Sequence, residues 1–356
     1  MKIGLLTFHF PDNFGAVLQT FALERFFENK LYDVSIINCV PREIEKKSFF
    51  VRSLRVRHIL GNVVRLFLYP FYMKRKRLFQ IFRENNLKIG TKSGCEIDFS
   101  FYDVICTGSD QTFNLNYPFT SVYYQIFKKR SFQKKIAYAP SFGSYDVSLL
   151  SDEMIDALKD FDGLSCRESD GALFLSEKTG RSVKEVLDPV FLLSKKEWLE
   201  MLRKRPFKEN YIFVYDLNGK ETLVNLALKH CKEKRVVVFS NDLMFSLRYK
   251  HRYRVSFVKC LSVEDFLTYI YYADSIFTDS FHGTAFSIIF QKQFNTYIAL
   301  KNASTRIYSL LERLNLKNRI VETDSVDKSM IDYDFVSERL KECVSISKDF
   351  FKENDL

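Results

Sequence analysis

The chain has 356 residues, of which 46% are hydrophobic and 16% aromatic, and its formal net charge at pH 7 is +10. This composition excludes a disordered chain, and the length favours two domains of ordinary size. No apolar run reaches the roughly 18–20 residues that span a bilayer, and Met1–Phe10 lacks the apolar core of a secretory signal, so we expect a cytoplasmic protein.

The first half of the chain alternates apolar runs of strand length with segments of helical spacing. The expected strands are Lys2–Phe8, Asp33–Cys39, Tyr102–Thr107, Lys135–Ala139 and Gly163–Cys166. The expected helices are Val17–Phe27, Asp152–Phe161 and Asp170–Thr179. A strand, a loop, a helix and a second strand in this order are the unit of a parallel, doubly wound sheet.

The second half repeats the alternation after Pro189. The expected strands are Tyr211–Tyr215, Arg235–Phe239, Ser275–Thr278 and Thr296–Leu300. The expected helices are Glu221–Cys231, Val263–Ala273, Thr284–Phe290, Ser304–Leu314 and a terminal helix over Val336–Phe351.

These patterns predict an α/β fold with two Rossmann-like domains facing a central cleft, as in the GT-B architecture. We place the N-terminal domain at residues 1–188 and the C-terminal domain at 189–330. Residues 331–356 hold the terminal helix, which we expect to pack back on the N-terminal domain.

The positive charge is concentrated in an insertion at residues 41–92, where 14 Lys or Arg accompany three Glu and no Asp. Basic and large apolar residues are interleaved there, which suits an anionic membrane surface or a lipid diphosphate. A solvated helical excursion whose aromatic residues join the core is the alternative. No nucleic-acid module accompanies the basic residues, so we expect no nucleic-acid partner.

Seven scattered cysteines with no C-x-x-C pair fit a reducing compartment. They indicate neither a disulfide framework nor a zinc site. We expect no metal and no cofactor.

Two polar motifs in the first half follow predicted strands. Asn13, Gly15 and Gln19 belong to a turn entering a helix, where backbone N–H groups can hold an anion. Ser109, Asp110 and Gln111 follow the third strand and either contact a ligand or cap a helix. Ser141 lies in the corresponding loop after the fourth strand.

Two further motifs carry the residues best suited to chemistry. Arg167 ends a strand, where a guanidinium can clamp a carboxylate or phosphate; a surface pair with Glu168 is the alternative. His282 lies between a strand and a helix beside Asp279 and Ser280, and a histidine exchanges protons near neutral pH.

Six segments in this order resemble the polysaccharide pyruvyl transferase family: NFGAVLQTFAL, TGSDQTFN, YAPSFG, SCRES, VLDPVFLL and TDSFHGTAFS. The resemblance implies transfer of a pyruvyl group from phosphoenolpyruvate, as donor substrate, to a sugar of a bacterial capsule or exopolysaccharide precursor. The product is a cyclic ketal, and phosphate is released. Because the basic insertion suits a lipid-linked anion, we expect an acceptor linked to undecaprenyl diphosphate and a protein that lies peripherally on the cytoplasmic face of the inner membrane.

By motif, the resemblance assigns roles to Arg167 and His282. Some members carry Arg-Leu before the histidine, whereas this chain has Ser280-Phe281, so Arg306 or Lys301 is expected to supply the missing cation. We expect His282 to transfer protons with Asp110 or Asp279 as helper. A GT-B nucleotide-sugar glycosyltransferase and a non-catalytic, membrane-docked component of glycan assembly are the alternatives.

Overall fold

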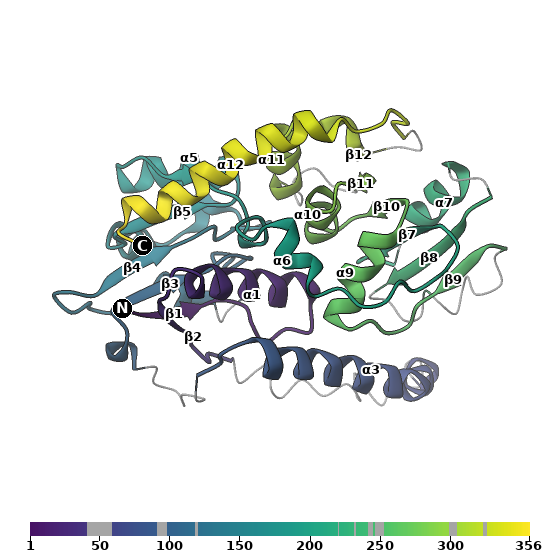
Figure 1. Ribbon diagram of the computed structural model, residues 1–356. Coiled ribbons are helices and arrows are strands. Elements are labelled where there is room, and N and C mark those ends of the chain that lie inside the picture. Colours follow the sequence, from purple (N-terminus) through teal and green to yellow (C-terminus); the bar gives the residue numbers. More distant parts are fainter. Residues whose placement is uncertain are drawn as a thin grey trace.

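A computed structural model describes residues 1–40, 59–90, 98–117, 120–219, 221–230, 233–240, 245, 253–298, 305–322 and 326–356. Within 59–90, side chains are described at 66 and from 68 onward. Two parallel β-sheets with flanking helices form the molecule (Figure 1). The predicted α/β fold with two Rossmann-like domains is confirmed.

The first sheet has the strand order β2-β1-β3-β4-β5-β6, and neighbouring strands are parallel. Its strands are β1 (Lys2–Leu6), β2 (Asp33–Ile36), β3 (Val104–Thr107), β4 (Lys134–Ala137), β5 (Gly163–Cys166) and β6 (Lys184–Glu185). All side chains of β3 and β5 are buried, as strands covered by helices on both faces require.

The helices of the first half are α1 (Phe14–Glu28), α3 (Ile59–Asn86), α4 (Asp152–Lys159) and α5 (Ser169–Thr179). Asn13 caps α1 by accepting hydrogen bonds from the backbone N–H groups of Gly15 and Ala16. α3 comes from the basic insertion, whose residues 41–58, 91 and 92 lie outside the described part. No helix in the described residues has the length and apolar character needed to cross a bilayer.

The second sheet has the order β12-β11-β10-β7-β8-β9, again with parallel neighbours. Its strands are β7 (Tyr211–Asp216), β8 (Arg235–Ser240), β9 (Val255–Phe257), β10 (Ser275–Thr278), β11 (Gln293–Tyr297) and β12 (Ile320–Val321). Its helices are α7 (Glu221–His230), α9 (Val263–Tyr272), α10 (Phe281–Ile289) and α11 (Thr305–Arg313). A short helix, α6 (Lys195–Leu199), lies between the two sheets in sequence.

Aromatic packing joins the two halves into a shared core. Phe14, at the first position of α1, is fully buried and stacks on Phe266 of α9 with ring centroids 4.4 Å apart. It also meets Tyr215 and Phe239 edge-on. The start of α1 is therefore fixed against the second domain.

The terminal helix α12 (Tyr333–Glu353) crosses from the second half to the first (Figure 1). Its Phe351 packs on Phe26 and Phe27 of α1 and on Tyr138 after β4. The Ser347 hydroxyl accepts a hydrogen bond from the backbone N–H of Leu187 at 2.9 Å. α12 thus bridges both halves of the molecule.

Several element boundaries differ from the sequence prediction. α10 begins at Phe281 rather than Thr284, because Ser280 caps it by accepting a hydrogen bond from the Gly283 N–H. β11 ends at Tyr297, three residues before the predicted end. The short strands β9 and β12 were not predicted, since three and two residues carry no recognisable periodicity.

Candidate functional site

The loops after the carboxyl ends of strands from both sheets enclose a small cavity of about 150 Å³. Such an edge is where open parallel sheets bind their ligands. The lining residues that the sequence predicted are Asn13, Asp110 and Gln111 from the first half and Asp279, Ser280, His282 and Arg306 from the second.

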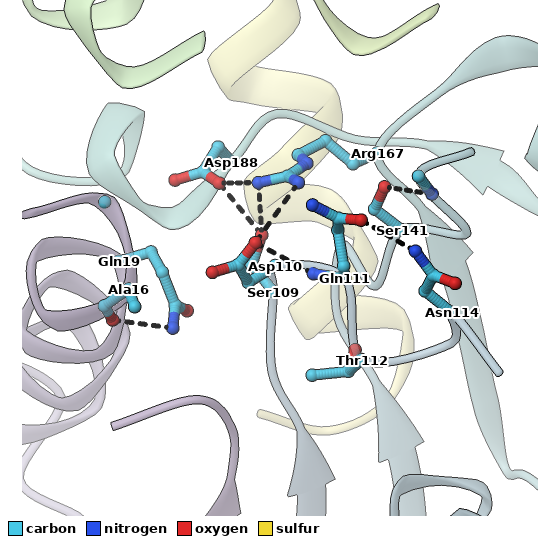
Figure 2. Close-up of polar contacts among 12 residues, drawn as sticks. Ala16, Gln19, Ser109, Asp110, Gln111, Thr112, Asn114, Ser141, Arg167 and Asp188 are labelled. Carbon is cyan, nitrogen blue, oxygen red and sulfur yellow. Dashed lines mark hydrogen bonds and ion pairs between the residues drawn. The ribbon is translucent and has the colours of Figure 1, made fainter. Parts of the chain in front are cut away.

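Asp188 lies behind this cavity as the centre of a buried polar network. Its Oδ2 is 2.5 Å from Nη1 of Arg167, accepts a hydrogen bond from the Ser109 hydroxyl at 2.9 Å and is 3.6 Å from Nε2 of His282. Figure 2 shows Arg167 between Asp188 and the Ser109–Asp110 turn. Side chains that follow β3, β5 and β6 thereby meet a histidine of the second domain.

The charge of Asp188 is stabilised by its neighbours. Burial by itself favours the protonated acid, but His282 and Arg167 outweigh that effect and hold the pKa of Asp188 well below its usual range. A permanent carboxylate at this position provides a fixed negative charge beside the imidazole.

His282 lies in the first turn of α10 and is 8% exposed. Its Nε2 has no hydrogen-bond partner among the described residues, since 3.6 Å from Asp188 is just beyond hydrogen-bond distance. Its Nδ1 side abuts Gly15, where a Cβ atom would come within 2.0 Å of Nδ1. Only a glycine at this position of α1 leaves space for the ring.

Asp279 directly follows β10 and is half-buried. Its carboxylate accepts hydrogen bonds from the Leu217 N–H at 2.8 Å and from the Asn218 amide at 2.6 Å. Burial, followed by the nearby charge of Asp216, raises the pKa of Asp279 to about 6. At neutral pH this carboxylate therefore accepts and returns protons readily.

Arg306, near the start of α11, is the cation that lines the cavity. It forms no hydrogen bond or ion pair with any residue that the structure describes. Burial and the neighbouring Arg167 lower the pKa of its guanidinium, so an anion placed beside it would stabilise the charged form. Lys301, the other predicted replacement cation, lies outside the described residues.

The structure places Arg167 differently from the prediction. Its side chain is 1% exposed and pairs with Asp188 rather than with Glu168 or a ligand in the cavity. Two of its nitrogens, Nε and Nη2, have no hydrogen-bond partner in the described part of the chain. Arg167 therefore lies behind the cavity, whereas Arg306 is among the residues that line it.

Three other predicted residues are buried and form hydrogen bonds within the protein. Gln19 is fully buried and donates hydrogen bonds to Thr7, Thr20 and the Ala16 carbonyl, the last of which Figure 2 shows. Ser141 is buried and accepts a hydrogen bond from the Gly143 N–H. The Ser109 hydroxyl donates a hydrogen bond to the Asp188 carboxylate. None of the three lines the cavity described above.

The turns around Asn13 and Asp110 also differ from expectation. The Asn13 side chain accepts hydrogen bonds from the N–H groups of Gly15 and Ala16, so these donors are not available to an anion. No helix follows Asp110 directly. Instead its backbone is left-handed, with φ 75°, and its carboxylate accepts a hydrogen bond from the Gln111 N–H.

Asp188 was not among the predicted site residues and was placed only as the last residue of the N-terminal domain. A usable signal was present, because Asp188 follows β6 as Arg167 follows β5, and adjacent parallel strands end at one edge. Within the described residues, no group of three or more His, Cys, Asp or Glu is arranged to hold a metal ion.

Solved structures share the fold at low sequence identity. UDP-GlcNAc 2-epimerase from Neisseria meningitidis, bound to UDP-GlcNAc, is similar over 99% of this chain and 93% of its own, with 9% identity and a TM-score of 0.50. S. aureus MnaA with UDP is similar over 98% of this chain and 91% of its own, with 11% identity and a TM-score of 0.49. Arabidopsis thaliana UGT89C1 is similar over 99% of this chain and 93% of its own, with 10% identity and a TM-score of 0.48. These likenesses concern the GT-B-like fold alone.

No curated protein sequence matches the chain. A family model described as polysaccharide pyruvyl transferase matches residues 13–299, from the turn that caps α1 to just beyond β11. The matched stretch contains Asp110, Arg167, Asp188 and His282, and Arg306 follows it. Because the match covers most of the length, the chain belongs to the polysaccharide pyruvyl transferase family.

Proposed function

We propose that the protein transfers the pyruvyl group of phosphoenolpyruvate to two hydroxyls of one sugar in a bacterial polysaccharide precursor. The product is a cyclic ketal, and inorganic phosphate leaves. The observation that carries the proposal is the shared cavity, in which His282 and the otherwise unpaired Arg306 lie beside Asp279.

Donor binding depends on positive charge. Phosphoenolpyruvate is a small anion with a phosphate and a carboxylate, and a guanidinium binds either group through paired N–H donors. Arg306 supplies such donors at the cavity, and the Gln111 amide and Ser280 lie on the same lining. Binding the donor would give Arg306 the anionic partner that it lacks in the described chain.

Proton transfer is assigned to His282. The imidazole protonates the methylene carbon of the donor, which leaves a cationic centre at the adjacent carbon. A first sugar hydroxyl adds to that centre and gives up its proton. The carboxylate of Asp188, 3.6 Å from Nε2, orients the ring for this transfer.

Asp279 is assigned as the base. Since its pKa is raised to about 6, it is mostly ionised at neutral pH and accepts the proton of the attacking hydroxyl. A second hydroxyl of the same sugar then displaces phosphate as the C–O bond to phosphate breaks, and its proton leaves with the phosphate. The ring closes, and no oxidant or reductant is consumed.

We further propose that the acceptor is linked to a lipid diphosphate such as undecaprenyl diphosphate, and that the reaction needs no cofactor. The support is the net charge of +11 between Arg42 and Lys92, which suits an anionic carrier or membrane. The sugar acceptor itself is not specified by these charges.

The proposal is tested by incubating the protein with phosphoenolpyruvate and a panel of lipid-linked oligosaccharides. We expect release of phosphate together with a product heavier than its acceptor by one pyruvate less one water. Thermal stabilisation should be seen with phosphoenolpyruvate and not with UDP or GDP. Transfer of a sugar from a nucleotide donor, with no phosphate released from phosphoenolpyruvate, would instead establish a glycosyltransferase.

A further inference from the structure

Helix α3 carries two faces of different character, and its inner face fastens it to the body of the protein. Arg75 donates a hydrogen bond to the Asp12 carbonyl at 2.8 Å, and Arg83 forms an ion pair with the Asp12 carboxylate at 2.8 Å. Phe79 and Phe82 on the same face are buried. These contacts account for the inward-facing residues without any partner molecule.

The outer face exposes large apolar side chains that the fold leaves uncovered. Leu66 is 60% exposed, and Met73 and Ile81 are each 41% exposed. They are separated by about two helical turns, so they form one stripe along α3, with the exposed Pro70 between the first two. The same geometry places the exposed Arg77 and Glu84 on this side of the helix as well, so the stripe is apolar with charged residues in it. Isolated apolar residues are common on surfaces, but an aligned stripe on one helix is not.

Cations surround this stripe. Lys74, Lys76 and Arg77 are all exposed, and helical geometry puts Lys74 and Lys76 on opposite flanks of the stripe. None of the three forms an ion pair within the described chain. Figure 1 shows α3 along the lower edge of the molecule, beneath both domains.

We propose that this outer face of α3 docks the protein on an anionic membrane surface. Apolar side chains enter the boundary between headgroups and acyl chains, while the flanking Lys and Arg contact anionic headgroups. A nucleic acid would satisfy the cations but would leave Leu66, Met73 and Ile81 uncovered, so the stripe favours lipid. The inference does not rest on the donor proposed above.

Docking through α3 would also orient the cavity. Arg75 and Arg83 hold Asp12, and its neighbour Asn13 lines the cavity, so α3 is joined to the site through one short loop. A lipid-linked sugar in the same membrane would then lie near the opening of the site. This consequence, unlike the docking itself, rests on the proposed lipid-linked acceptor.

The test is flotation of the full chain with vesicles of phosphatidylglycerol and phosphatidylcholine, or of phosphatidylcholine alone. One variant carries Lys74→Gln, Lys76→Gln and Arg77→Gln, and a second carries Leu66→Gln, Met73→Gln and Ile81→Gln. The matched control neutralises three exposed lysines outside α3, by Lys128→Gln, Lys204→Gln and Lys341→Gln. Circular dichroism establishes that each variant is folded.

We expect the wild type to bind the anionic vesicles only, and less as salt is raised. Neutralising the three α3 cations should weaken partitioning on the order of 100-fold, and the apolar variant should lose binding as well, whereas the control should bind normally. Absence of wild-type binding, an equal loss in the control, or tighter binding to duplex DNA than to vesicles would overturn the proposal. Phosphate release with a lipid-free acceptor, measured in parallel, reports on the proposed function separately.

Discussion

At the scale of single residues, the site is organised by charges buried behind the cavity and by proton carriers on its wall. Asp188 pairs with Arg167 at 2.5 Å and lies 3.6 Å from His282, so one carboxylate links a side chain of each domain. His282 and Asp279 face the cavity itself. The buried ion pair is therefore separate from the proposed acid and base.

His282→Ala should slow phosphate release from phosphoenolpyruvate by about 10²-fold or more, the usual contribution of a general acid or base. The rate is measured with saturating donor and acceptor, after the thermal transition shows that the variant is folded. His230→Ala, in a helix away from the cavity, is the control and should react normally. A near-normal rate in His282→Ala would remove the imidazole from the chemistry.

Asp188→Asn should destabilise the fold by about 3–5 kcal/mol, because it leaves the Arg167 charge buried without its partner. Since the folded-state pKa of Asp188 is depressed, its contribution is present above the unfolded value of about 3.9 and is lost as the pH falls below it. Urea unfolding at pH 7 therefore measures the full effect. The double variant with Arg167→Met should lose less than the sum of the two single variants, and strict additivity would argue against the buried pair.

Asp279 predicts a pH dependence of the rate. As a base whose pKa is raised to about 6, it must be ionised to act, so activity should be present above pH 6 and fall as the pH drops through that value. Asp279→Asn should be slow at every pH and should lack this acidic limb. A variant that keeps the limb would show that another group produces it.

The same carboxyl has the opposite effect on folding. Because its pKa is raised in the folded state, its contribution to stability is complete below pH 4 and is lost as the pH rises through about 6. At pH 8, Asp279→Asn should therefore stabilise the protein, by at most about 3 kcal/mol. Comparison of urea midpoints at pH 8 and pH 5 measures the difference, which should shrink at the lower pH.

At the scale of elements, the position of His282 depends on how α1 and α10 meet. A Cβ atom at Gly15, in the first turn of α1, would lie 2.0 Å from Nδ1 of His282. Gly15→Ala should therefore displace the ring and lower the rate by about the same 10²-fold as loss of the imidazole. In the His282→Ala background the same substitution should cost nothing further, and an additional loss there would mean that Gly15 acts by another route.

Most elements could be predicted from the sequence because long apolar runs and helical spacing are recognisable without knowing which elements pack against them. The strands around β1, β3, β7 and β8 are of this kind, and so is α12. The strands β9 and β12 were missed because their pairing with β8 and β11, rather than their own residues, defines them.

The candidate site was predicted as a set of loops but not as a network. Because they follow the ends of predicted strands, Asp110, Arg167 and His282 were expected to lie near one another, and they do. Which of them lines the cavity depends on side-chain partners, and Arg167 pairs with Asp188 behind it. The close approach of Gly15 to His282 joins residues 267 positions apart, which no local pattern encodes.

At the scale of the whole molecule, the cavity depends on the fixed position of the two domains relative to each other. Phe14 of the first domain stacks on Phe266 of the second at 4.4 Å, one residue before Gly15. α12 adds a second connection through Phe351. Aromatic packing at two places therefore holds the two domains together.

Phe14→Ala should destabilise the protein by about 3–5 kcal/mol, since it leaves a cavity at the junction of the domains. It should also reduce phosphate release, because α1 then no longer fixes Gly15 against His282. Urea unfolding followed by fluorescence and by activity measures both effects. Phe132→Ala, at a side chain that is 95% exposed, is the control, and an equal effect there would contradict the role of Phe14.

The most direct measurement is a crystal structure of the protein with phosphoenolpyruvate bound. The proposed function predicts density for the donor in the cavity between the two sheets, with an anionic group on the Arg306 guanidinium and the methylene carbon facing the His282 ring. Density for the donor at a place away from Arg306 and His282, or none in crystals soaked at saturating concentration, would contradict it.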